Sequence, residues 1–185
     1  VLKSFTFNGI RKPWRYTRSG REKPPFSSIS RNLLTIPGRH GAFLRNSQRE
    51  PLVINQPIGF RVDDDLQGLR LKDEIAEWLV TAEPVALQFD DEPGRTYYAI
   101  VQNTIDDFER MSRLRQGTIQ FLCPDPHGYS DVIYQDITAD NRFVVNEGTA
   151  ETRPFFYFTI MRPVTQVTIT NRSIPGNPSV ILGRA

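Results

Sequence analysis

The chain has 185 residues, of which 38% are hydrophobic, so it is long and apolar enough to bury a core in one large or two small domains. Charged residues make up 24% of the chain, the formal net charge is +2, and acids and bases are interspersed along most of it. This pattern argues against a dedicated nucleic-acid-binding protein, which usually carries a concentrated basic face. The single cysteine, Cys123, excludes an internal disulfide and a cysteine-based zinc cluster.

The N-terminal quarter is extended in its pattern and basic in its charge. Residues 1–7 alternate apolar and polar positions before an Asn-Gly turn, which is typical of a short edge strand. Residues 11–30 contain three prolines and several aromatic residues, which favours an extended segment that follows the surface. Within residues 3–49 the only acid is Glu22. We interpret this local excess of Lys and Arg as a solvated surface rather than a phosphate-binding site.

The next segment predicts a β-hairpin that has no obvious place in a core. Two apolar runs, at residues 33–36 and 42–44, flank a connection whose proline and two glycines suit a tight turn between strands. Polar, basic stretches lie on both sides, so we expect an arm over residues 30–45 that is held away from the body. A protruding arm with apolar side chains normally needs a partner.

One strand and one helix follow the arm. Residues 51–62 predict a strand in which Pro57 marks an edge or a bulge. Three consecutive aspartates then introduce a helix over residues 69–82, which Pro84 ends because proline cannot continue the hydrogen-bond ladder. The apolar residues of this helix recur at the spacing of one buried face. This core face consists of Leu71, Ile75, Trp78 and Leu79.

From Val85 onward the pattern is β throughout. Residues 85–89 and 96–102 predict a second hairpin around an acidic turn. For residues 105–115 we favour a strand, with one or two helical turns as the alternative. Further strands are predicted at 117–123, 132–138 and 142–146.

A small, polar stretch at residues 147–152 predicts a domain boundary. Beyond it lie three strand-like runs, at 155–160, 164–170 and 180–182. They are too few to bury a core alone, so we expect them to be the opening of a second β-sandwich.

The sequence shows no enzyme motif. Both histidines, His40 and His127, lie in Gly- and Pro-rich turns, where a surface imidazole is far more common than a catalytic one. Cys123 has the apolar parity of its strand, which favours a buried, inert thiol. The acidic turns at 63–65 and 90–92 lack the spacing of a calcium loop, and we interpret them as solvated turns. We therefore expect no catalytic residue, cofactor or metal ion, and, without an apolar run near the ~20 residues of a membrane span, no membrane insertion.

Several blocks, taken in order, resemble the distal tail protein (Dit) family of bacteriophages with long, non-contractile tails, in particular those of Gram-positive hosts. The blocks are FNGI, the arm RNLLTIPGRHGA, the helix ending in Trp78-Leu79, PVALQFDDEPGRTYYAIV, GTIQFLCPDPHGY and NEGTAETRPFF. Their succession over residues 5–158 carries the resemblance more than any single block does.

The resemblance implies a mainly β fold. The expected N-terminal domain is β-sandwich-like, with one flanking α-helix and the extended β-hairpin arm, and covers residues 1–148. Residues 149–185 would form a linker and the first strands of a second β-sandwich, similar to galectins or carbohydrate-binding modules and incomplete here.

The resemblance also implies a structural hub in the virion. Six copies would form a ring at the tail tip that joins the tail tube protein to the tail-tip protein and to receptor-binding proteins. DNA would pass through the lumen without specific binding, and the protein would be made in the cytoplasm of the bacterial host.

Ring assembly gives the arm a physical rationale, because an isolated hairpin is marginal in water. Its apolar side chains would lie against the next subunit's sheet; they are Leu33, Leu34, Ile36, Phe43 and Leu44. A lumen that releases DNA should not be strongly cationic. We hypothesise that acids line it, with Asp63, Asp64, Asp65, Asp90, Asp91 and Glu92 as the candidates.

Two other functions stay open on the sequence. Aromatic residues at 155–158, together with Trp14 and Trp78, could form a sugar platform, which would suit a carbohydrate-binding adhesin module that contacts the host cell wall. The helix spacing instead assigns Trp78 to the core. A cell-wall hydrolase component is the second alternative, although no nucleophile or metal set is recognisable.

Overall fold

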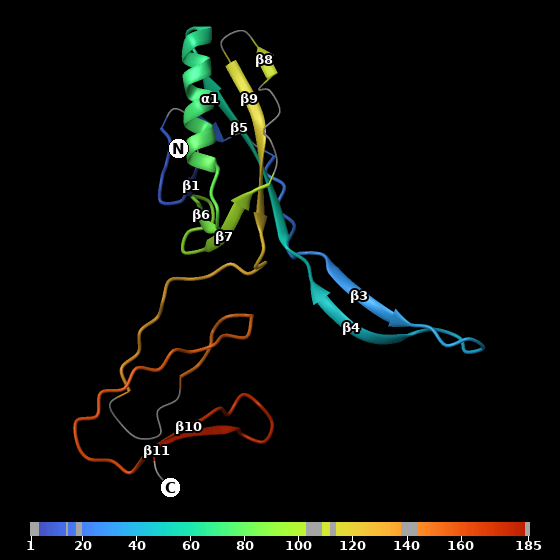
Figure 1. The fold of residues 1–185 in the computed structure, drawn as a ribbon, viewed down its shortest axis with the longest axis vertical. Coiled ribbons are helices and arrows are strands. Elements are labelled where there is room, and N and C mark those ends of the chain that lie inside the picture. Colours follow the sequence, from blue (N-terminus) through green and yellow to red (C-terminus); the bar gives the residue numbers. More distant parts are fainter. Residues whose placement is uncertain are drawn as a thin grey trace. The chain divides into compact units, whose positions relative to one another are not determined.

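The computed structural model describes residues 4–13, 15–17, 20–102, 109–111, 114–137 and 144–183 (Figure 1). The chain is mainly β, as predicted, and divides into two compact units, residues 1–140 and 141–185. The boundary expected at residues 147–152 lies a few residues inside the second unit. Among the described residues, no helix is long and apolar enough to cross a membrane.

The body of the first unit is one antiparallel sheet. Its strands are β1 (Phe5–Phe7), β2 (Arg15–Thr17), β5 (Leu52–Arg61), β6 (Val85–Phe89), β7 (Thr96–Val101), β8 (Glu109–Met111) and β9 (Leu114–Cys123). They are arranged in the order β1-β6-β7-β9-β5-β2, with β8 beside β9. The longest pairing joins β5 to β9, both ten residues long, from Leu52 opposite Cys123 to Arg61 opposite Leu114. The other strands of the body sheet are attached to this long pair.

The sheet curls, so that strands far apart in its order face each other. In a flat sheet β1 and β9, three strand spacings apart, would be separated by roughly 14 Å. The ring of Phe121 in β9 nevertheless lies 5.4 Å from the ring of Phe5 and 5.3 Å from that of Phe7, both in β1, measured between centroids. The two strands therefore enclose a shared apolar interior.

Helix α1 (Asp65–Leu79) closes this interior. Ile75, Trp78 and Leu79 are buried, and Leu71 packs against the same core half-buried. This is the face that the helical spacing predicts. The indole of Trp78 stacks on Phe5 at 5.8 Å and donates its Nε1–H to the backbone oxygen of Phe7 at 3.0 Å. The helix is thus tied to β1 by both packing and a buried hydrogen bond.

The ends of the helix differ from the prediction of residues 69–82. It begins at Asp65 because Asp64 is its N-cap, whose carboxylate accepts a hydrogen bond from the Gln67 backbone N–H at 2.6 Å. It ends at Leu79 because Val80 takes an extended conformation. A longer helix would bring the ring of Pro84 against the carbonyl of Val80, four residues earlier.

Pro57 was predicted to mark an edge or a bulge. No bulge forms, because β5 pairs with β9 without a shift, but the pairing of β5 with β2 covers only Ile58 to Phe60 and does not include Pro57. Asn55 exchanges two backbone hydrogen bonds with Glu22. Residues two apart in a strand point their backbone groups the same way, so Pro57 also faces the N-terminal segment rather than β9. No bond of the main ladder is lost, and the side chain of Gln56 donates to the Pro57 oxygen at 2.8 Å.

The two remaining hairpins stand outside the body sheet. Strands β3 (Ile29–Leu34) and β4 (Phe43–Arg49) form a two-stranded sheet of their own, the predicted arm. In the second unit, β10 (Gln166–Thr170) pairs with β11 (Ser179–Gly183).

Several other strand predictions differ from the structure. Within the described residues, 132–137, 144–146 and 155–160 form no strand, so those predictions are wrong there. An apolar or alternating run becomes a strand only where another strand pairs with it. For residues 105–115 a single strand was favoured, but the described residues form two antiparallel strands, β8 and the start of β9. Residues 1–3, 103–108, 112–113 and 138–143 lie outside the described residues.

Replacing Trp78 with Phe should destabilise the body. The change removes the indole N–H that bonds the Phe7 carbonyl while keeping an aromatic ring in the core. We expect the free energy of unfolding to fall by about 1–2 kcal/mol, the cost of losing a buried hydrogen bond and some packing. Urea denaturation followed by circular dichroism measures it. Phe26→Leu is the control, since that ring is 68% exposed, and an equal loss in both variants would contradict the prediction.

Candidate subunit interface

The arm is a polar stem that carries an apolar tip. Strands β3 and β4 pair from Ile29 opposite Arg49 to Leu34 opposite Phe43, and every residue of both strands is exposed. The central pairs are polar, such as Asn32 opposite Asn46. The register then shifts around Arg45, which leaves this residue as a bulge, and only apolar pairs follow.

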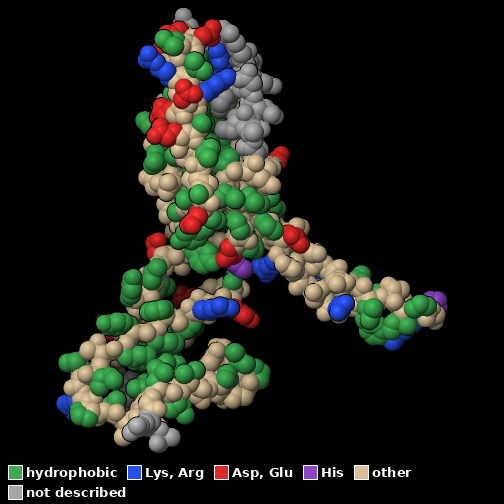
Figure 2. Space-filling model, viewed as in Figure 1, with side chains coloured by type: hydrophobic (Ala, Val, Ile, Leu, Met, Phe, Trp, Pro, Cys, Tyr) green, Lys and Arg blue, Asp and Glu red, His purple; other side chains and the backbone are tan. Residues whose placement is uncertain are grey.

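The tip presents apolar side chains on both of its faces. Residues directly opposite each other in a hairpin share a face, and neighbours along a strand alternate. Leu33 and Leu44 therefore lie on one face, and Leu34 and Phe43 on the other. These four side chains are 44–58% exposed, and Ile36 is 44% exposed. Figure 2 shows the hydrophobic side chains gathered at the far end of the arm. If the hairpin packed on the core of its own subunit, one of its two faces would be covered.

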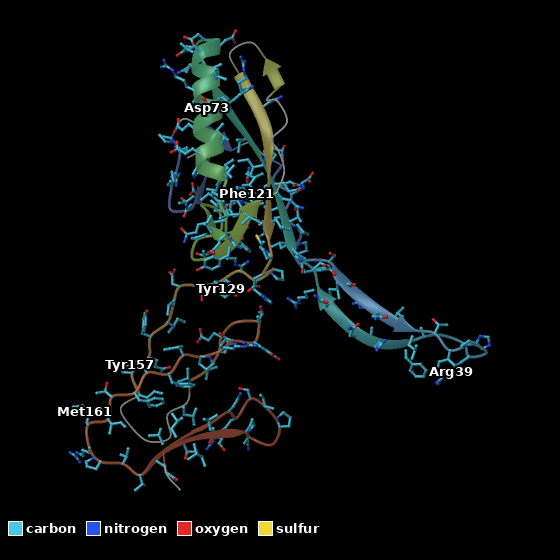
Figure 3. The ribbon with its side chains drawn as sticks, viewed as in Figure 1. Arg39, Asp73, Phe121, Tyr129, Tyr157 and Met161 are labelled. Atoms are coloured by element: carbon cyan, nitrogen blue, oxygen red, sulfur yellow. The ribbon has the colours of Figure 1, made fainter. Side chains whose placement is uncertain are left out.

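The turn at the tip is sharp, and its arginine packs on an aromatic ring of the arm. Arg39 donates its backbone N–H to the Ile36 oxygen at 3.2 Å, and Gly38 has a φ of +81°, as a type II turn with proline in its second position requires. The Arg39 guanidinium lies 4.3 Å from the centroid of the Phe43 ring (Figure 3). The tip thus combines apolar and cationic contact surface.

The root of the arm is tied to the segment after β9. Arg49 lies 3.5 Å from Nε2 of His127, whose Nδ1 lies 2.5 Å from the carboxylate of Asp125. Tyr129 also donates its hydroxyl to Asp125. Burial alone would raise the pKa of Asp125, but the hydrogen bonds from Tyr129 and His127 together lower it. No prediction from the sequence covers this root. Its only local signal is the spacing Asp-x-His-x-Tyr within a turn.

The acids of the 90–92 turn are paired with cations of the N-terminal segment. Arg11 holds Asp90 through two bonds of 2.8 Å. Arg21 contacts Asp91 at 2.7 Å. The interpretation of the basic N-terminal quarter as a solvated surface is therefore wrong for these cations, which hold the segment against the body.

Glu92 is the most enclosed acid of this turn. It accepts hydrogen bonds from Lys23 at 2.5 and 2.6 Å, from Arg21 at 3.1 Å and from the Tyr97 hydroxyl at 2.8 Å. Burial is the largest single influence and raises its pKa, but the bonds from Lys23 and Tyr97 and the charges of Lys23 and Arg21 outweigh it, so the pKa of Glu92 lies below its ordinary value.

The other acidic turn has structural roles at the start of α1. Asp64 caps the helix, and Asp65 accepts a hydrogen bond of 3.3 Å from the nearly buried Arg115. The backbone N–H of Asp63 bonds the side chain of Gln67 at 2.6 Å. That these three acids and those at 90–92 face a channel stays a prediction.

The remaining candidate residues carry little chemistry. Within the described part of the chain, no group of His, Cys, Asp and Glu could hold a metal ion. Cys123 is fully buried, which raises its thiol pKa to about 11, so it is no nucleophile at neutral pH.

The aromatic residues proposed as a sugar platform divide into buried and exposed ones. Trp78 is buried in the core and cannot contribute to one, and Trp14 lies outside the described residues. Phe155 and Tyr157 are 96% and 88% exposed, while Phe156 and Phe158 stack on each other with their centroids 6.2 Å apart.

A complete β body that carries an exposed apolar arm indicates a structural protein with an assembly surface. Residues 15–123 match the family model described as the phage tail protein RIFT-related domain, and the chain belongs to this family of phage tail proteins. It is 34% identical over 70 residues to the distal tail protein of Bacillus phage SPP1, a match that covers 38% of this chain and 27% of that protein.

A solved structure has a similar fold. It is the crystal structure of the SPP1 Dit protein, described as a paradigm of the hub adsorption apparatus in phages that infect Gram-positive bacteria. The TM-score is 0.62 at 20% identity, over 70% of this chain and 53% of that one. The chain thus spans about half the length of that structure. Together these matches confirm the resemblance to the Dit family.

The ion pairs of Glu92 should make stability depend on pH. A carboxylate whose folded pKa lies below its ordinary value of 4.5 stabilises the fold above that value, and the contribution disappears as the pH falls through the folded pKa. At pH about 7, Glu92→Gln should lower the free energy of unfolding by about 1–2 kcal/mol, and the difference from the wild type should shrink toward pH about 3. Urea denaturation at both pH values tests this, with the exposed Glu83→Gln as control. A pH-independent difference would contradict it.

Proposed function

We propose that this chain is the distal tail hub of a phage with a long, non-contractile tail. In this role six copies form a ring at the tail tip of the virion, which joins the tail tube protein to the tail-tip and receptor-binding proteins. The observation that carries the proposal is the arm, which exposes apolar side chains on both faces beside a body that is complete without it.

The body does not need the arm for its core. The buried hydrophobic cluster draws on β1, β5, β6, β7, β9 and α1, and it includes no residue of β3 or β4. Covering the five apolar side chains of the tip would contribute about 1 kcal/mol each, since each is already partly covered. One arm thus supplies on the order of 5 kcal/mol before the cost of ordering it is subtracted. A contact of this size supports assembly between copies that each give and receive one arm.

The charge distribution suits a ring through which DNA passes. The formal net charge of the chain is +2, and the cations Arg11, Arg21 and Lys23 are each held by an acid of the same subunit. A lumen lined with free Lys and Arg would hold the phosphates, because each phosphate contact adds affinity. Near-neutral subunits allow DNA to pass without specific binding.

In this proposal the second unit faces outward. Residues 149–185 contain the β10–β11 hairpin and the exposed run that includes Phe155 and Tyr157. We propose that they are a linker and the opening strands of a second β-sandwich on the side of the adsorption apparatus.

Electron microscopy of the purified protein tests the ring directly, and six-fold particles are expected. Replacing Leu33, Leu34, Phe43 and Leu44 together with Ser should convert the ring to monomers, because the tip then keeps only Ile36 of its five apolar side chains. Size-exclusion chromatography with light scattering measures the mass. The unfolding free energy of the body should stay within about 0.5 kcal/mol, since these positions are exposed.

The matched control changes the stem instead of the tip. Ser30→Ala with Gln48→Ala removes exposed polar atoms from one stem pair and should leave the ring intact. Hexamers that survive the four serine substitutions, or a wild-type chain that is monomeric, would overturn the proposal.

A further inference from the structure

The outer side of α1 carries a second stripe of residues, separate from the buried one. Leu66, Leu69, Asp73, Ala76 and Val80 follow one another at intervals of three and four residues, the spacing of a helix face that packs on a partner. At about 100° per residue, this stripe lies opposite Ile75 and Trp78. Leu66 is 59% exposed, Leu69 58% and Val80 78%. Figure 3 labels Asp73 on this helix.

The stripe is acidic as well as apolar. Asp73 and Glu77 lie one turn apart, where like charges destabilise a helix. In the part of the chain that the structure describes, no cation forms an ion pair with either of them. Residues 63–83 hold seven acids against two bases, Arg70 and Lys72. The outer face of α1 therefore suits a partner that brings both apolar and cationic side chains.

The arm has this complementary composition. Residues 29–49 contain four arginines, Arg31, Arg39, Arg45 and Arg49, and no acid. Arg39 lies over Phe43, and Arg45 is the bulge beside the Leu33–Leu44 pair, so two of the four cations lie at the apolar tip. Among the described residues, neither Arg39 nor Arg45 forms an ion pair with an acid of its own chain.

The arm of each chain points away from the outer face of its own α1 (Figure 1). The arm joins β5 at Leu52, and the start of α1 follows the other end of β5 at Arg61. A ten-residue strand is about 30 Å long, so the arm root and the start of α1 lie at opposite ends of β5, and α1 then runs back along the body toward Trp78 (Figure 1). The arm extends away from the body, so its tip does not reach α1 of its own chain and the contact needs a second copy (Figure 1).

We propose that the tip of the arm docks on the outer face of α1 of a neighbouring copy. The apolar tip covers Leu66 and Leu69, and Arg39 and Arg45 neutralise Asp73 and Glu77. The inference rests on the proposed ring assembly and names its receiving surface, which is the helix rather than the sheet. Each subunit gives an arm and receives one on a different surface, which is the head-to-tail contact that a ring requires.

Charge reversal on each side tests the contact. Asp73→Lys with Glu77→Lys on the helix, or Arg39→Glu with Arg45→Glu on the arm, should each raise the protein concentration needed for half-assembly at least about 100-fold, because like charges then meet. All four substitutions in one chain should restore the ring. Glu83→Lys, which reverses a charge off the stripe, is the control and should keep it.

A mixing experiment defines the direction of the contact. The helix variant keeps an intact arm, and the variant with four serines at the arm tip keeps an intact helix. Mixed in equal amounts, these two should form a dimer of one chain each and no larger species, as light scattering would show. Circular dichroism confirms that each variant is folded.

The outcomes separate this inference from the function on which it rests. If the arm variant loses the ring while the helix variant keeps it, assembly through the arm stands and α1 is not its docking site. If the wild-type chain forms no oligomer, both proposals fall. If both reversals abolish the ring but the four-residue combination does not restore it, the charge pairing is wrong.

Discussion

The pairing of β5 with β9 is the constraint on which the rest of the molecule depends. Its register turns Ile54, Ile58 and Phe121 into the interior, and a slip of one residue would turn them outward. One end of β5 continues through Glu50 and Pro51 into the arm, and the other leads through the Asp64 cap into α1. The same strand therefore fixes where the arm leaves the body and where the helix begins.

The interior that this pair encloses is closed by aromatic packing. Phe5 lies between Trp78, Phe89 and Phe121, and the Trp78 indole bonds the backbone of β1. Because this core is complete, the exposed apolar tip of the arm is not a fault in packing. Association with another chain would bury these apolar side chains. A two-stranded hairpin alone would be marginal in water.

The sequence could predict what depends on local pattern. Helical spacing identifies the buried face with Ile75 and Trp78, and turn chemistry identifies the arm, since Gly38 and Pro37 suit one turn type. It could not predict what depends on contacts between distant residues. The Arg21–Asp91 pair joins residues 70 positions apart, and the curl that brings Phe5 to Phe121 results from four strands together. The aromatic run at 155–160 has strand-like residues but forms no strand in the described structure, so its pattern alone was misleading.

The separation of charge along the chain joins fold and assembly. Within the N-terminal segment, cations such as Arg21 are neutralised inside the subunit, but the basic arm points away from the body that carries the acidic outer face of α1 (Figure 1). A single subunit therefore cannot bury its arm against its own α1. Two such subunits can form one contact between an arm and an α1 face. Only in a closed ring does every arm and every α1 face form such a contact. In the proposed ring, closure would also pair the cations of each arm with acids of the next copy.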